Sequence, residues 1–143
     1  MLYQVKKANK KIDVAIFSAA VADFKIKKRS EIKIKKKNLK SILLKKNVDI
    51  LKTISVLKTN RPKYIVGFSA ETNGIINAKK KLNEKNCDMI IYNKISNDNK
   101  VFGLNENKIS IITNNKIKNY SKTSKVNCAK YIVESIYKKI KIK

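Results

Sequence analysis

Three apolar runs along the chain predict β-strands that are buried on both faces. They occupy residues 13–17, 64–68 and 88–92, and each combines β-branched with aromatic side chains. Such runs are typical of strands at the centre of a parallel sheet. We expect the first strand to run from about residue 13 to 19 in that central position, and the apolar run 109–112 to form a fourth strand.

Apolar residues at helical spacing separate the predicted strands. A short helix is expected within residues 1–11, and a second begins near Asn47 or Asp49, either of which can cap it. Strands that alternate with helices predict βαβ units with right-handed crossovers, and the chain 1–143, without repeats or a linker, is expected to form one domain. Two further helices are predicted over residues 74–86 and 122–140.

A basic segment, residues 25–46, interrupts this order. In it Ile32 and Ile34 alternate with Lys33 and Lys35. Alternation with a period of two predicts a two-stranded ribbon that is polar on one face. The alternative is a solvated hairpin that covers a sheet edge, with its lysines preventing edge-to-edge association. The apolar residues expected on the returning strand are Leu39, Ile42 and Leu44.

The strongly basic charge of the chain raises the question of whether it binds nucleic acid. The 143 residues include 35 lysines and arginines against 10 acidic residues, a net charge of +25. Only Arg29 and Arg61 are arginines, although arginine is the residue that recognises bases and phosphates bidentately. We therefore expect only non-specific affinity for nucleic acid. A basic nucleic-acid-associated protein is the alternative function, and the absence of a recognition helix or an aromatic-studded sheet motif argues against it.

Other features of the sequence argue against a disulfide-rich, zinc-binding, membrane-spanning or secreted protein. Cys87 and Cys128 are too few for a disulfide framework, and the chain has no histidine to complete a zinc site. No apolar run approaches the ~20 residues of a membrane span, and the N-terminus lacks the apolar core of a signal peptide. We expect a cytoplasmic protein with reduced thiols and no membrane contact.

The end of the first predicted strand carries the candidate chemistry. Residues 18–24 read Ser-Ala-Ala-Val-Ala-Asp-Phe. Small side chains there let a ligand approach the backbone. The carboxylate of Asp23 can accept a hydrogen bond from a hydroxyl or hold a metal, at the carboxyl end of the strands, where open α/β sheets bind ligands. The simpler interpretation is that the alanines make room for helix packing and Asp23 caps a turn.

The glycines indicate that the sheet is incomplete. A self-sufficient nucleotide-binding sheet usually has a glycine-rich turn after its first strand. Here Gly67, Gly74 and Gly103 are scattered, and the chain starts on a helix that would normally come later. We predict an α/β fold, an incomplete Rossmann-like three-layer parallel sheet with an inserted basic β-ribbon.

Several motifs together resemble a known family. The chain is similar over residues 3–137 to phosphopantothenate–cysteine ligase, the synthetase half of the bifunctional coenzyme A biosynthesis protein, in the DNA/pantothenate metabolism flavoprotein C-terminal domain family. The motifs stand in the family's order and spacing. They are residues 18–24, 33–36, 47–51, 66–72, 78–81 with Lys85, 88–93, and Phe102-Gly103 running to Asn107.

The resemblance implies a ligase of coenzyme A biosynthesis. In the bacterial type, CTP activates the carboxylate of 4′-phosphopantothenate as an acyl-cytidylate and pyrophosphate leaves. The amine of cysteine then attacks, giving 4′-phosphopantothenoyl-cysteine, with Mg²⁺ assisting. The family's flavin-dependent decarboxylase half has no counterpart here, so no flavin is expected in this chain.

The resemblance also implies roles for residues in the first half of the chain. Asp23 matches a nucleotide-contacting aspartate, and Ala19 and Ala20 match small residues beside the acyl group. Lys33 matches a lysine that meets the triphosphate and is the expected catalytic residue. A helix-opening loop that contacts the nucleotide is matched by Val48, Asp49, Ile50 and Leu51.

Later residues match further nucleotide contacts. Phe68 matches an aromatic residue that lines the base pocket, and Lys81 and Lys85, four residues apart, match lysines that contact the nucleotide. Simpler interpretations remain for each, because Phe68 suits an ordinary core and chance matches are common in a chain this rich in lysine. For Lys35, Lys36 and Lys37 a solvated face is the preferred interpretation.

The family's first strand, its glycine-containing turn and an asparagine beside the acyl-cytidylate have no match. The resemblance therefore implies either that another polypeptide completes the site or that the chain is an inactive remnant. Because the family is dimeric, the resemblance also implies that a second copy of this chain is a partner, in a homodimer. The residues leave the choice between CTP and ATP open, as well as the ligands of any metal.

Overall fold

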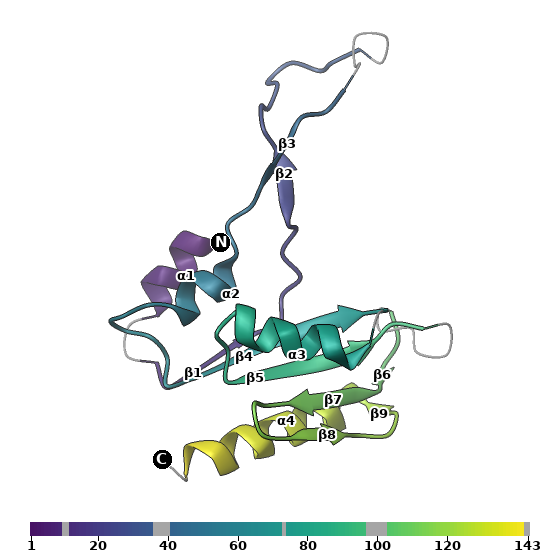
Figure 1. Cartoon of the computed structure of the whole chain (residues 1–143). Coiled ribbons are helices and arrows are strands. Elements are labelled where there is room, and N and C mark those ends of the chain that lie inside the picture. Colours follow the sequence, from purple (N-terminus) through teal and green to yellow (C-terminus); the bar gives the residue numbers. More distant parts are fainter. Residues whose placement is uncertain (10–11, 36–40, 73, 97–102, 142–143) are drawn as a thin grey trace.

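The computed structural model describes residues 1–9, 12–35, 41–72, 74–96 and 103–141 (Figure 1). The Lys36, Lys37 and Leu39 positions of the predicted ribbon, and Phe102 of the quoted motifs, lie outside these ranges. The elements in chain order are α1 (Leu2–Ala8), β1 (Val14–Phe17), β2 (Phe24–Ile26), β3 (Leu44–Lys46), α2 (Ile50–Ser55), β4 (Tyr64–Glu71), α3 (Ile75–Glu84), β5 (Met89–Lys94), β6 (Glu106–Asn107), β7 (Ile109–Ile112), β8 (Ile117–Asn119), β9 (Thr123–Ser124) and α4 (Lys125–Ile140).

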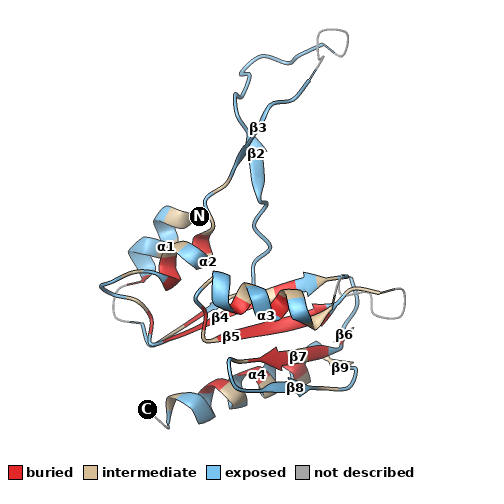
Figure 2. Ribbon diagram, in the orientation of Figure 1, coloured by how far each residue is buried: buried red, intermediate tan, exposed pale blue. Residues whose placement is uncertain are grey.

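A five-stranded sheet with the order β1-β4-β5-β7-β8 forms the centre of the molecule. Strands β1, β4 and β5 are parallel, and β4 and β5 are its most buried strands (Figure 2). Helices α1, α2 and α3 lie on one face of the sheet and α4 lies on the other (Figure 1). The protein therefore has the predicted three-layer α/β fold.

Alternation along β4 divides the core between the two faces. Ile65 packs with residues of α2 and α3, whereas the neighbouring Tyr64 and Val66 pack with α4. This follows from the geometry of a strand, in which successive side chains point to opposite faces. A strand that is covered on both faces can hold an unbroken apolar run, which explains why this segment was predictable.

Two predictions about the sheet are wrong. The first strand, expected over residues 13–19 at the centre, spans only Val14–Phe17 and lies at the edge, where Ile16 is 47% exposed. The fourth strand, β7, runs antiparallel to β5. A parallel β7 would need a crossover connection, usually a helix, and the chain between β5 and β7 has no described helix.

The predicted ribbon is confirmed in type but is shorter than expected. Strands β2 and β3 are antiparallel, with Phe24 opposite Lys46 and Ile26 opposite Leu44. Ile32 lies outside both strands. The described part of the ribbon projects away from the sheet as an exposed arm, which we define as residues 24–35 and 41–46 (Figures 1 and 2). It therefore does not cover a sheet edge, the alternative considered above.

Among the described residues, no helix has both the length and the apolar character needed to cross a bilayer.

Candidate functional site

A cavity of about 540 Å³ opens where β1 and β4 end. The register pairs Phe17 with Gly67, so the residues that follow β1 and the last part of β4 lie at the same, carboxyl end of the strands. This is the end of the strands at which open α/β sheets bind their ligands. The lining comes from segments 15–23 and 47–51, together with Phe68, Lys81 and Lys85, and from Met1, Val5 and Ile12.

Hydrogen bonds tie the two lining loops together. The backbone N–H of Asn47 donates to the carbonyl of Asp23, and its side-chain amide donates to the carbonyl of Ala22, both at 2.7 Å. Asn47 therefore fixes the loop that follows β1 against the loop that opens α2. Its amide role was missed by the sequence reasoning, because contacts between distant loops leave no pattern along the chain.

Asp49 is the N-cap of α2, one of the two residues predicted for that position. Its carboxylate accepts a hydrogen bond from the backbone N–H of Lys52 at 2.9 Å and also pairs with the ammonium group of Lys85. The cap accounts for the start of the helix, and the ion pair joins that start to the end of α3. Asp49 therefore has a structural role at the rim of the cavity.

Gly67 allows α2 to pack closely on the sheet. A Cβ atom at this position would lie 2.7 Å from a methyl group of Leu51 and 2.9 Å from one of Ile90. Without that side chain, Leu51 can pack on β4 and also line the cavity. The glycine thus permits a close approach, which a larger residue would allow only if Leu51 and Ile90 shifted, and the conformation of its backbone is ordinary.

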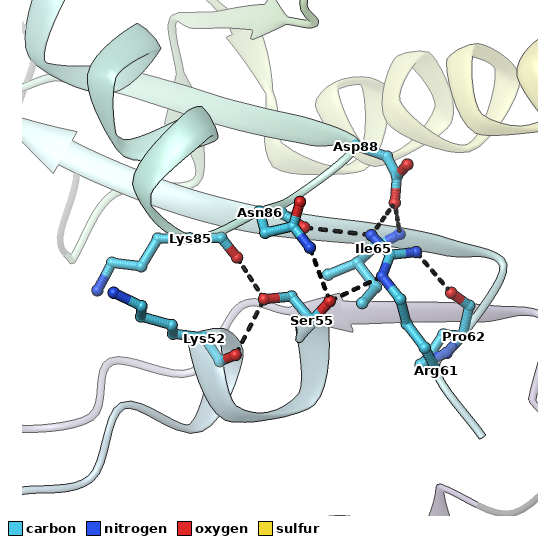
Figure 3. Close-up of polar contacts among 8 residues, drawn as sticks. All are labelled: Lys52, Ser55, Arg61, Pro62, Ile65, Lys85, Asn86 and Asp88. Carbon is cyan, nitrogen blue, oxygen red and sulfur yellow. Dashed lines mark hydrogen bonds and ion pairs between the residues drawn. The ribbon is translucent and has the colours of Figure 1, made fainter. Parts of the chain in front are cut away.

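A polar network holds the other end of α2 (Figure 3). The guanidinium group of Arg61 donates to the carbonyl of Ser55 at 2.8 Å and to the carboxylate of Asp88 at 3.1 Å. That carboxylate also accepts from the backbone N–H of Ile65 at 2.8 Å, and Asn86 donates to the Ser55 carbonyl at 2.9 Å. The network positions α2, and with it one wall of the cavity, against β4 and the turn before β5.

The cavity brings together almost all of the site residues expected from the sequence. Lys33 is the exception, since it lies exposed on the arm and away from the lining. Asp23 and Phe68, which arrive from different strands, share one rim. The functions of these residues remain predictions. The expected residues in the lining are Ala19, Ala20, Asp23, Val48, Asp49, Ile50, Leu51, Phe68, Lys81 and Lys85.

Glu71, at the end of β4, is a neighbour of the site that sequence reasoning missed. Its carboxylate pairs with the ammonium group of Lys81 and accepts a hydrogen bond from the hydroxyl of Ser69 at 3.1 Å. Each of the two cavity lysines therefore has a carboxylate partner. No group of three metal-ligating side chains occurs within the described residues. The carboxylates suit Mg²⁺ only as an ion brought in with phosphates, which needs one or two protein carboxylates.

The cysteines are free and buried, and they lie outside the cavity lining. Burial raises the pKa of Cys87 to about 12, and the nearby Asp88 carboxylate acts in the same direction. Burial also raises the pKa of Cys128. Because the thiolate is the reactive form, neither side chain is suited to act as a nucleophile at neutral pH.

We expect the two paired carboxylates to make stability depend on pH. Burial opposes ionisation of Asp49, but the Lys52 N–H and Lys85 outweigh it and lower its pKa, while the hydrogen bond from Lys81 lowers the pKa of Glu71. Carboxyls with lowered pKa stabilise the fold above their unfolded values near pH 4, and this contribution is lost as pH falls further.

Thermal unfolding between pH 6 and pH 3 measures this contribution. The Tm of the wild type should fall more steeply below about pH 4 than that of the Asp49→Asn, Glu71→Gln double variant. Glu84→Gln, which removes a more exposed carboxylate of α3, is the control and should follow the wild type. Parallel curves for the wild type and the double variant would contradict the assignment.

The comparisons with known proteins agree with this fold. The family model "DFP: DNA/pantothenate metabolism flavoprotein C-terminal domain" matches residues 1–140. The coenzyme A biosynthesis bifunctional protein CoaBC of Haemophilus influenzae is 41% identical over 128 residues, which cover 88% of this chain and 32% of that protein. For CoaBC of Bacillus subtilis the identity is 42% over 93 residues, 64% of this chain and 22% of that protein. The chain thus spans about a third or less of the length of these relatives.

Two solved structures are also similar. The C-terminal domain of a CoaBC protein superposes with a TM-score of 0.76 and 28% identity, covering 99% of this chain and 62% of that chain. The DNA/pantothenate metabolism flavoprotein from Streptococcus pneumoniae has a TM-score of 0.70 at 20% identity over 95% of this chain and 67% of that one, which shows the shared fold alone. On the evidence of the family match across nearly its whole length, this chain belongs to the DNA/pantothenate metabolism flavoprotein C-terminal domain family.

Proposed function

We propose that the cavity binds a nucleoside triphosphate, CTP, beside 4′-phosphopantothenate, and that the chain takes part in joining this acid to cysteine. One observation carries the proposal: ten of the eleven residues expected from the family resemblance line a single cavity at the carboxyl ends of β1 and β4. The gathering of residues from segments between Ala19 and Lys85 supports the roles that the family resemblance implies for them.

The proposed reaction has two steps. The carboxylate of 4′-phosphopantothenate attacks the α-phosphorus of CTP, forming an acyl-cytidylate and releasing pyrophosphate. The amine of cysteine then attacks the acyl carbon, forms the amide and releases CMP. Mg²⁺, held chiefly by the nucleotide's phosphates, supplies charge neutralisation. The product is 4′-phosphopantothenoyl-cysteine, and we expect this chemistry to take place in the cytoplasm.

The lining offers side chains of the kinds that these ligands need. Ala19 and Ala20 leave room for the acyl group beside the strand end, and the ring of Phe68 offers a face for the base. The ammonium groups of Lys81 and Lys85 supply positive charge at the rim for the phosphates. Asp23 supplies a carboxylate that can contact the nucleotide. Backbone contacts with the base would distinguish cytosine from adenine less sharply than side chains, so CTP over ATP rests on the family.

Lys33 can contact the triphosphate only if the arm lies close to a nucleotide cavity, either that of its own chain or that of a second subunit. The arm exposes an apolar face formed by Phe24, Ile26 and Leu44, and an isolated two-stranded ribbon is only marginally stable. We therefore propose that the arm is covered in a homodimer and that Lys33 reaches a triphosphate from there. A second subunit would then take part in the site.

The cavity also has an open side next to β1. Among the described residues, β1 pairs with β4 alone, and Ile16 is exposed beside the unpaired edge. We propose that a strand from outside this sequence, in the same polypeptide or in another, pairs with this edge and completes the phosphate-binding part of the site. The solved C-terminal domain is longer than this chain, which is consistent with such a segment.

Turnover tests this proposal. The chain is mixed with the part of the Haemophilus influenzae synthetase half that precedes the aligned region, and 4′-phosphopantothenate, cysteine, CTP and Mg²⁺ are added. We expect the ligated product by mass spectrometry when both polypeptides are present, and little or none with either one alone. Replacing CTP by ATP tests the base. If the two polypeptides associate and no product forms with either nucleotide, the chain is an inactive remnant of the ligase.

A further inference from the structure

The Glu71–Lys81 pair differs from an ordinary surface ion pair in its surroundings. The side chain of Glu71 is only 15% exposed, whereas that of Lys81 is 44% exposed and lines the cavity. The carboxylate also accepts a hydrogen bond from the hydroxyl of Ser69, so it is held from two sides. One end of the pair is therefore fixed in the sheet and the other end lies at the rim of the site.

The local structure accounts for this arrangement. Ser69 and Glu71 are two residues apart on β4, so their side chains point to the same face of the sheet, the face that α3 covers. Lys81 projects from the last turn of α3, next to the buried Leu82. The pair thus links the carboxyl end of β4, where ligands of parallel sheets bind, to the helix above it.

A second pair on the same helix shows the contrast. Lys80 and Glu84 are 3.6 Å apart, and both side chains are more than half exposed. Neither residue lines the cavity. An exposed pair of this kind contributes little and leaves the lysine free to sample many rotamers. It provides a matched control for the Glu71 pair.

We propose that Glu71 is a positioning residue that holds the ammonium group of Lys81 at the rim of the cavity, where it meets the phosphate chain of the nucleotide. The inference rests on the proposed function for the identity of the ligand, while the anchoring itself rests on the contacts of Glu71. A free lysine loses rotamer freedom when it is fixed on a ligand. Holding it in place beforehand reduces that cost, and this favours binding.

The first test needs no ligand. The full chain is treated briefly with an amine-acylating reagent, and the extent of modification of each lysine is read by mass spectrometry. In Glu71→Gln the acylation rate of Lys81 should rise about threefold or more, because the ammonium is released from its partner. Ser69→Ala should give a smaller rise, and Lys79 on the same helix should not change. In Glu84→Gln, Lys81 should react at the wild-type rate. Equal reactivity of Lys81 in wild type and Glu71→Gln would overturn the proposal, whether or not a nucleotide binds.

The second test separates positioning from a general structural role. In the two-polypeptide enzyme, Glu71→Gln should raise the KM for CTP about 3- to 10-fold with a smaller change in kcat, and Glu84→Gln should change neither. In a Lys81→Met background, Glu71→Gln should have no further effect on KM, because its action passes through the lysine. Independent, multiplicative effects of the two substitutions would overturn the proposal. If Glu71→Gln changes Lys81 reactivity while the wild type neither binds nor uses a nucleotide, the anchor stands and the proposed function is what fails.

Discussion

Replacing Arg61 with alanine is expected to lower the free energy of unfolding by about 2–4 kcal/mol. Its guanidinium donates to the carbonyls of Ser55, Pro62 and Asn86 at 2.8, 2.9 and 3.1 Å, and to the carboxylate of Asp88 at 3.1 Å (Figure 3). The substitution removes the shared donor of three carbonyls and leaves the partly buried carboxylate without its cationic partner. Urea unfolding followed by circular dichroism measures the loss.

The chain provides a matched control for this prediction. Arg29, the other arginine, is exposed on the arm, so Arg29→Ala should change the free energy of unfolding by less than about 0.5 kcal/mol. Arg61→Lys should recover only part of the loss, because an ammonium group cannot reproduce the planar fork of donors. An Arg61→Ala variant as stable as Arg29→Ala would show that the network does not hold α2 in place.

Replacing Lys33 with alanine is expected to lower the kcat of the two-polypeptide ligase by about 10²–10³-fold. The proposal gives this lysine the task of stabilising negative charge as pyrophosphate leaves, and a cation that acts mainly in the transition state affects kcat more than KM. Steady-state rates of pyrophosphate release at varied CTP concentrations separate the two constants.

Lys35 is the control for Lys33. It lies on the same exposed segment of the arm, two residues further along, and its preferred interpretation is a solvated side chain. Lys35→Ala should therefore retain nearly full activity. Equal losses in the two variants would mean that the arm contributes only a diffuse positive charge, and unchanged turnover in Lys33→Ala would remove that lysine from the mechanism.

The interior of the fold was predictable from the sequence because burial on both faces leaves a pattern. Strands β4 and β5 follow directly from the apolar runs 64–68 and 88–92, and the N-cap of α2 could be narrowed to Asn47 or Asp49, of which the structure has Asp49. The edge position of β1 could not be read in this way. Its run looks like that of a central strand, and the pattern cannot say which neighbours are present to cover it.

The site divides along similar lines. Residues that follow parallel strands gather at the carboxyl end of the sheet, so the proximity of Asp23 and Phe68 could be expected from the sequence. Asn47 and Glu71 act through contacts between loops and across layers, which no local spacing encodes. The position of Lys33 depends on where the arm lies, and the arm exposes Phe24, Ile26 and Leu44, which no spacing along the chain could place.

The central claim is that the cavity at the end of β1 and β4 is a nucleotide site completed by a further strand. Calorimetric titration of CTP with Mg²⁺ tests it most directly, first into the chain alone and then into the chain mixed with the complementing segment. The account predicts weak or undetectable binding to the chain alone and an affinity at least about tenfold higher, or 1.4 kcal/mol, with both present. An affinity for CTP that does not increase when both polypeptides are present and associated would contradict it.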